Sequence, residues 1–195
     1  MAHSLSRSPS TSSRALGLAG VVGGAVLLAA FVLDIRPELN VFRLILFNAG
    51  AMAVVVAVHR CQSSVSPRLA LLAAVPALLA NGWYLVGVVL ASGRPHPFAG
   101  DFGSMMFYAG AAMWLSDAAF GLVTLRLGVV TRWGALALAI GSVLAFTGMD
   151  RLELTSSANP TIFTPLSLVG IALNGIGWIL LGLDVATRGR AEAGG

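Results

Sequence analysis

The sequence has no lysine and a single cysteine, Cys61, among its 195 residues. Without lysine, neither a retinal Schiff base nor a catalytic lysine can form. One cysteine excludes a disulfide scaffold, a Cys-x-x-Cys redox pair and a structural zinc site built on cysteines. The histidines are His3 in the N-terminal tail and His59 and His96 at opposite ends of apolar segments, which does not support paired haem ligation. We therefore expect no metal and no other cofactor.

Charged residues are scarce as well. They make up 10% of the chain, whereas 57% of the residues are hydrophobic and the mean hydropathy is +0.87. A soluble domain carries about 25% charged residues, because it needs them to cover its surface. Disordered chains, in turn, are poor in apolar residues. The composition therefore predicts a multi-pass integral membrane protein, with the lipid bilayer as its first partner.

Motifs that would name a reaction are missing too. The chain has no Gly-x-Ser-x-Gly, no His-Glu-x-x-His and no Walker loop. Basic residues nowhere form a run longer than two in a short window, so we expect no nucleic-acid partner. The cluster His59-Arg60-Cys61 at the end of an apolar segment indicates no function by itself.

Six apolar stretches are long enough, or nearly so, to cross a membrane, which takes about 20 residues. They are 15–33, 41–59, 69–91, 105–125, 133–149 and 165–183. The sequence therefore predicts an all-α bundle of six transmembrane helices over 15–183, with tails at 1–14 and 184–195. The connecting loops are too short to hold a soluble domain.

Arginines are distributed unevenly between the two predicted sides of the membrane. With six spans, both termini share one side, and eight of the twelve arginines fall there: Arg7, Arg14, Arg60, Arg68, Arg126, Arg132, Arg188 and Arg190. Because cytoplasmic loops are enriched in basic residues, we expect a plasma-membrane protein with both termini in the cytoplasm. Arg43, near the end of the second span, is expected to snorkel to the interface.

Small residues and short internal similarities suggest how the helices pack. Phe47-Asn48-Ala49-Gly50-Ala51 resembles Phe107-Tyr108-Ala109-Gly110-Ala111, and Gly50, Gly110 and Gly170 are each 60 residues apart. Three repeated helical hairpins would explain this, although Ala- and Gly-rich helices also match by chance. Small-residue stripes, such as Gly20 with Gly24 and Gly134 with Gly141 and Gly148, predict close helix contacts. These contacts lie either within the chain or in a homo-oligomer.

The centres of the second to sixth spans each carry a polar residue: Asn48, Asn81, Asp117, Ser142 and Asn174. At a rise of 1.5 Å per residue, all lie within about 3 Å of the membrane midplane. Lipid offers such groups no hydrogen bonds, so they are expected to face one another or a wet cavity. This polar layer is the predicted substrate-binding site.

Asp117 is the only acidic residue inside a predicted span. It shares a helical face with Gly110, Trp114 and Gly121, and the Trp114 indole is expected to form an aromatic wall of the site. No basic residue lies at the depth of Asp117 to pair with it. Burial disfavours an unpaired charge, so we expect a protonated carboxyl, or a charged one with a cation or water nearby. A neutral aspartic acid that only joins two helices is the alternative.

Two aromatic residues lie one helical turn from the asparagines of the polar layer. They are Tyr84, beside Asn81, and Trp178, beside Asn174. We expect them to line the same site, with ordinary packing as the alternative. The outer loops carry a second group, which either binds a cation or is solvated charge balanced by arginines: Asp34, Glu38, His96, Asp101, Asp150 and Glu153.

Three function classes fit this sequence. The first is a transporter or binder of an apolar or cationic small molecule, with its site around Asp117. The second is an intramembrane enzyme that acts on a lipid or isoprenoid with a carboxyl general acid; its catalytic residues are not identified. The third is a scaffold or accessory membrane subunit that needs only packing faces. The first is the preferred hypothesis.

Overall fold

Every regular element in the described part of the chain is an α-helix. The computed structural model describes residues 11–32, 38–92, 100–148 and 164–191. The helices are α1 (Thr11–Val32), α2 (Glu38–Gln62), α3 (Pro67–Ala91), α4 (Gly100–Leu127), α5 (Arg132–Thr147) and α6 (Pro165–Ala191). Each includes most of one predicted apolar segment, and α6 continues well past residue 183. The predicted all-α bundle is confirmed.

Proline and glycine set several helix boundaries. Pro67 and Pro165 open α3 and α6, where the missing proline N–H leaves no helical hydrogen bond unmade. After α4, Gly128 has a φ of +62°, a left-handed conformation that glycine adopts without strain. Gly148 ends α5, and its N–H donates to the Leu144 carbonyl at 3.0 Å.

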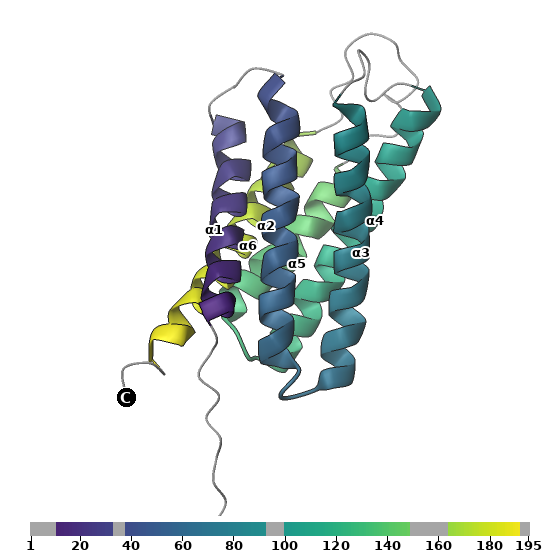
Figure 1. Ribbon diagram of the computed structural model, residues 1–195. Coiled ribbons are helices and arrows are strands. Elements are labelled where there is room, and N and C mark those ends of the chain that lie inside the picture. The colour runs from purple at the N-terminus through teal and green to yellow at the C-terminus, as the bar shows by residue number, and fades with distance from the viewer. Residues whose placement is uncertain (1–10, 33–37, 93–99, 149–163, 192–195) are drawn as a thin grey trace, which may run out of the picture.

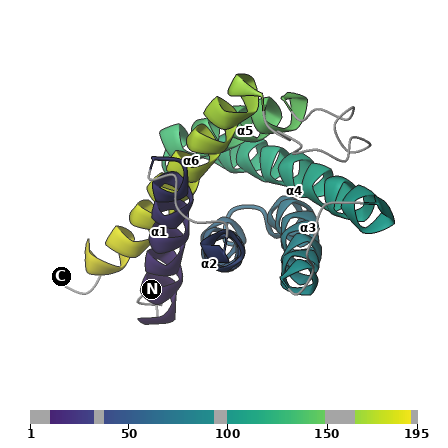
Figure 2. The ribbon, with the colours of Figure 1, turned by 90° about the horizontal axis from the view of Figure 1, so that it is seen from above.

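The helices form a closed ring in which each packs against its neighbours in sequence and α1 packs against α6. Seen from above, α1, α2 and α3 form one layer and α6, α5 and α4 the other (Figure 2), with α2 also touching α6. One end holds the connections 63–66 and 128–131 and both ends of the described chain (Figure 1). It also carries Arg60, Arg68, Arg126 and Arg132, and is called the arginine-rich end below.

Four of the helices are long and apolar enough to cross a membrane: Val41–Gln62 of α2, Pro67–Ala91 of α3, Asp101–Leu127 of α4 and Pro165–Arg188 of α6. At 1.5 Å per residue, 22 residues reach about 33 Å, which exceeds a typical hydrocarbon core of about 30 Å. The apolar parts of α1 and α5, Arg14–Ala29 and Arg132–Thr147, are shorter.

The distribution of side chains is that of a protein surrounded by lipid. The outward face of α3 presents large apolar residues, with Leu72 and Leu79 about 70% exposed. The buried side chains, by contrast, include polar ones: Arg43, Asn48, Gln62, Asn81, Ser116, Asp117, Thr124, Ser142, Ser167 and Asn174. Apolar outside and polar inside is expected of a membrane bundle, whose polar groups must find partners within the protein.

Glycines let α1 lie directly against both of its neighbours. A methyl group added at Gly24 would lie 2.7 Å from the carbonyl oxygen of Gly175 on α6. One added at Gly23 would lie 3.0 Å from the Leu46 carbonyl oxygen and 3.1 Å from the Cα of Gly50 on α2. The backbones are therefore in contact, and this small-residue stripe packs within the chain.

The stripe on α5 is also used within the chain. A methyl group at Gly141 would lie 2.7 Å from the carbonyl oxygen of Gly170 on α6, and the reverse distance is also 2.7 Å. Gly134 and Gly148 contact α6 in the same way, through Leu181 and Ser167. Gly170 thus serves helix contact, and the threefold repeat that would relate it to Gly50 and Gly110 stays a prediction.

Candidate functional site

All five polar residues predicted at mid-membrane are fully buried: Asn48, Asn81, Asp117, Ser142 and Asn174. None of these side chains faces the lipid, as the polar-layer hypothesis requires. Because they come from α2, α3, α4, α5 and α6, the layer spans most of the ring. Their role in binding a ligand stays a prediction.

Asp117 on α4 is held by a single hydrogen bond from α3. The Nδ2 of Asn81 donates to Asp117 Oδ1 at 2.8 Å and to the Ala77 carbonyl oxygen at 2.9 Å. Both amide hydrogens of Asn81 are thereby used, which fixes the amide between the two helices. The other carboxyl oxygen, Oδ2, is buried and has no hydrogen-bond partner among the described residues.

A second short chain of hydrogen bonds joins α6 to α5 beside this carboxyl. The Nδ2 of Asn174 donates to Ser142 Oγ at 2.9 Å, and Ser142 Oγ donates to the Leu138 carbonyl oxygen at 2.7 Å. The Asn174 amide also lies close enough to Asp117 to interact with its carboxyl electrostatically. Four helices, α3 to α6, therefore meet around Asp117 through polar side chains.

Asn48 on α2 belongs to the same depth but makes a local contact. Its Nδ2 donates to the Leu44 carbonyl oxygen, one turn earlier on its own helix, at 2.7 Å. No hydrogen bond among the described residues joins it to Asp117. The Asn48 Oδ1 is buried without a partner, so this amide leaves an acceptor free in the bundle interior.

The polar layer has a surplus of buried acceptors. Four oxygen atoms lack a hydrogen-bond donor in the described part of the chain: Asn48 Oδ1, Asn81 Oδ1, Asp117 Oδ2 and Asn174 Oδ1. Each such oxygen costs about 1–3 kcal/mol of lost hydration. A proton, a cation or a ligand with several N–H donors offsets that cost. The layer is therefore suited chemically to something that carries positive charge.

Aromatic residues cover the polar layer on one side. Trp178 and Phe120 are fully buried and stack with ring centroids 6.0 Å apart and planes 25° apart. Phe120 lies one turn past Asp117 on α4 and Trp178 one turn past Asn174 on α6, both toward the arginine-rich end. The Trp178 Nε1 has no partner among the described residues. On the α4 and α6 side of the bundle, the stack therefore lies between the polar layer and that end.

The other two predicted aromatic residues occupy different environments. Trp114 is buried, with 6% of its surface exposed, one turn from Asp117 toward the opposite end. Tyr84 on α3 is only half-buried but packs against the hydrophobic core. The structure thus places Trp114 and Trp178 in the interior on either side of the Asp117 level, and Tyr84 closer to the surface.

A second buried polar pair escaped the sequence analysis. The Nε2 of Gln62, the last residue of α2, donates to Thr124 Oγ1 on α4 at 2.9 Å, and both side chains are fully buried. The Gln62 Oε1 and the Nδ1 of His59 are buried without a hydrogen-bond partner in the described ranges. The sequence contains one indication of this pair: Thr124 lies seven residues after Asp117, which puts both on one face of α4.

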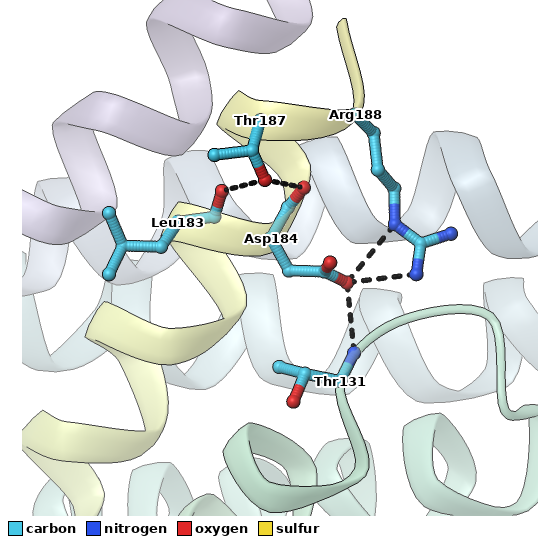
Figure 3. A network of polar contacts seen from close by, with 5 residues as sticks. All are labelled: Thr131, Leu183, Asp184, Thr187 and Arg188. Carbon is cyan, nitrogen blue, oxygen red and sulfur yellow. Dashed lines mark hydrogen bonds and ion pairs between the residues drawn. The ribbon is translucent and has the colours of Figure 1, made fainter. Parts of the chain in front are cut away.

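Asp184 is another residue with a structural role that the sequence did not indicate. Figure 3 shows its Oδ2 accepting from the backbone N–H of Thr131 at 2.9 Å and from Arg188 Nε at 3.1 Å. The Arg188 Nη2 completes an ion pair at 3.0 Å. Because Thr131 directly precedes α5, this carboxylate of α6 caps the N-terminus of α5, where negative charge is favourable. The cluster stabilises the helix ends.

Two predictions outside the polar layer fare differently. Arg43 was expected to snorkel to the membrane interface, but only 8% of its surface is exposed. The side chain is therefore covered by protein, and its position at the membrane interface stays a prediction.

Of the outer-loop group, Asp34, His96, Asp150 and Glu153 lie outside the described residues, and only the backbone of Glu38 is described. Asp101 is exposed, and the described residues contain no group of metal-ligating side chains.

Comparison of the chain with known protein families, with curated proteins and with solved structures finds no match.

Proposed function

We propose that this protein is a small membrane transporter or binder of a monovalent cationic small molecule, with Asp117 as the residue that takes its positive charge. One observation carries the proposal. Asp117 Oδ2 is fully buried without a hydrogen bond from the residues that the structure describes, and three amide oxygens that likewise lack donors there lie in the same layer. A buried carboxyl with a spare oxygen is what a proton- or cation-coupled site needs.

The charge of the layer limits what it can hold. Asp117 supplies one negative charge, and its hydrogen-bond partner, Asn81, is a neutral amide. Amide oxygens add dipoles but no charge, so one proton or one monovalent cation neutralises the site. A proton on Asp117 and a cation beside it exclude each other, because each compensates the same charge. The proposed chemistry is therefore competition between a proton and a cation for one carboxyl.

The two rival classes differ in what they require around Asp117. An enzyme acting on a lipid or isoprenoid needs a second acid or base within reach of the first. In the described part of the chain, the polar contacts of Asp117 are with amides. A scaffold requires only that the polar side chains join helices. In a scaffold, a proton on Asp117 compensates the carboxyl oxygen, but up to three amide oxygens of the layer still lack donors among the described residues, which favours the binding hypothesis.

We further propose that all six helices cross the membrane. α4 ends at the arginine-rich end and α6 begins at the opposite end (Figure 1), so α5 has to bring the chain back across. The same argument applies to α1, which starts at the arginine-rich end and precedes α2 (Figure 1). The excess of arginine at that end favours its location in the cytoplasm, and reporter fusions to both termini test this orientation.

The proposed site can be tested by chemical labelling. Dicyclohexylcarbodiimide is an apolar reagent that couples to carboxyl groups in apolar surroundings, and each adduct is counted by intact mass. We expect one adduct on the wild type and none on Asp117→Asn. Sodium, potassium or methylammonium ions, added one at a time over a series of pH values, should slow labelling at least tenfold for the preferred cation. Asp184→Asn, which removes a carboxylate outside the layer, is the matched control and should label like the wild type.

The opposite result is equally clear. Labelling that responds to neither cation nor pH would show that Asp117 does not exchange its proton for a cation. If Asp117→Asn also unfolded within about 1 kcal/mol of the wild type, as expected for a residue that only joins helices, the scaffold hypothesis would replace the proposed function.

A further inference from the structure

The polar layer is not the only polar part of the bundle interior. Gln62 and Thr124 join α2 to α4 near the arginine-rich end through a fully buried hydrogen bond of 2.9 Å. α2 and α4 are not neighbours in the ring, so this contact crosses its interior. Gln62 Oε1 and His59 Nδ1 are buried there without partners among the described residues. Such atoms are costly unless water or a ligand reaches them.

This pair lies on the line between Asp117 and the arginine-rich end. Thr124 is seven residues beyond Asp117 on the same face of α4, about 10.5 Å along the helix axis. The stacked rings of Phe120 and Trp178 lie between the two levels. From Asp117 toward the arginine-rich end, the interior therefore presents one aromatic layer and then a polar group with free acceptors.

The same face of α4 is different on the other side of Asp117. Toward the opposite end it presents Trp114, Met113, Gly110 and Met106, which are buried and offer no hydrogen-bond acceptor for a cation, since the Trp114 N–H can only donate. A charged or strongly hydrated species is disfavoured beside apolar side chains. Along this face of α4, the side-chain acceptors that could accompany such a species thus lie on the arginine-rich side of Asp117.

We propose that Gln62 and Thr124, with His59, form the entry site through which the cation bound at Asp117 enters from the arginine-rich end. This inference rests on the proposed function. Gln62 Oε1 is an acceptor for a cation or amine that has left the water, and His59 Nδ1 is a second one in the tautomer that leaves this nitrogen unprotonated. Thr124 Oγ1 lies next along the path toward Asp117. The aromatic stack is the barrier that such a ligand then passes. The described arginines at this end are all exposed, where salt screens their charge over about 8 Å: Arg14, Arg60, Arg68, Arg126, Arg132 and Arg188.

Access to Asp117 can be measured with a thiol reagent. Cys61→Ser provides a background without cysteine, into which Asp117→Cys is introduced. The reagent is a methanethiosulfonate that carries a quaternary ammonium group and does not cross membranes, applied to either side of sealed vesicles. Ser64→Cys and Ser92→Cys, both at exposed positions at opposite ends, report which side faces the reagent. If Asp117→Cys does not purify as a folded protein, Asn81→Cys takes its place.

We expect the thiol at position 117 to react from the arginine-rich side only. Gln62→Leu and Thr124→Val keep the volume of the side chains but remove their acceptors, and should slow this reaction at least tenfold. Thr187→Val is the matched control, because Thr187 is exposed and its hydroxyl bonds only to carbonyls of its own helix. The control should leave the rate within twofold.

Any other pattern of reaction contradicts the proposed entry site. Reaction from the opposite side, equal reaction from both sides or no reaction from either would contradict the direction of access. Rates that Gln62→Leu and Thr124→Val leave unchanged or increase would contradict the role of these acceptors. Failure of the proposed function is recognised separately, because it appears as wild-type carbodiimide labelling that no cation slows.

Discussion

The contact between α5 and α6 gives a sharp test of the structure. The perturbation is Gly170→Ala, which places a methyl group at the closest approach of the two helices. The added carbon would lie 2.7 Å from both the Gly141 carbonyl oxygen and the Leu144 carbonyl carbon. Both atoms belong to backbone, which cannot rotate away as a flexible side chain can. The helices must therefore separate by several tenths of an ångström.

The size of the effect follows from two opposing terms. Alanine favours a helix over glycine by about 1 kcal/mol. Overpacking a well-packed interior costs about 1–3 kcal/mol. Gly82→Ala on α3 isolates the first term, because its methyl group would meet only the flexible Met52 Cε at 3.8 Å. We expect Gly82→Ala to be neutral or stabilising by up to about 1 kcal/mol, and Gly170→Ala to be less stable than it by about 1–3 kcal/mol.

The assay is unfolding in mixed micelles as sodium dodecyl sulfate is titrated, followed by circular dichroism and tryptophan fluorescence. Both variants carry the same chemical change in the middle of an apolar helix, so effects on detergent binding cancel in the comparison. If Gly170→Ala were as stable as Gly82→Ala, the backbones of α5 and α6 would not be in direct contact. The close approach that holds Asn174 against Ser142 would then be refuted.

Two further perturbations separate packing from polar chemistry. Trp178→Phe should keep the stack on Phe120 and change the free energy of unfolding by less than about 1.5 kcal/mol. Trp178→Ala removes the stack and should cost about 3–5 kcal/mol in the same titration. If both variants lost a similar amount of stability, the indole N–H would have a hydrogen-bond partner that Phe cannot replace. Asp184→Ala should cost about 0.5–2 kcal/mol by removing the cap of α5. Asp184→Asn can still accept from the Thr131 N–H, so it should lose only the exposed ion pair, which is worth about 0–1 kcal/mol. If Asp184→Ala and Asp184→Asn lowered the free energy of unfolding equally, Asp184 would not cap α5.

The helices could be predicted because apolar runs of this length have few alternatives in lipid. The depth of a residue in the membrane could also be predicted, because it follows from the residue's position along its helix. The burial of Asn48, Asn81, Asp117 and Asn174 agrees with the predicted polar layer. Depth does not specify partners, however. Which amide meets Asp117 depends on helix rotation and on the order of helices around the ring. Asn81 turned out to bond to Asp117 directly, whereas Asn48 bonds to its own helix.

The features that sequence analysis missed depend on tertiary structure in a stronger way. Gln62 and Thr124 meet across the ring interior, between helices that are not neighbours in it. Arg43 lies near the start of α2, and its burial cannot be read from the sequence because it depends on what packs around it in three dimensions. Asp184 lies in a segment predicted to be a tail, but α6 extends through it and brings the carboxylate to the start of α5.

The packing of α1 against α6 also orders events during synthesis. α1 is made before α6, the neighbour that covers Gly17 and Gly24, and four helices lie between the two in the sequence. Until then the glycine stripe facing α6 is open to lipid or to insertion machinery, and the ring is a five-helix arc. The contact that closes the ring joins helices that lie far apart in the sequence, and contacts of long sequence separation are expected to form later than local ones. A protein cut short before α6 would carry Asp117, Asn81 and Ser142 but neither Asn174 nor a closed interior, so assembly of the polar layer has to wait for α6.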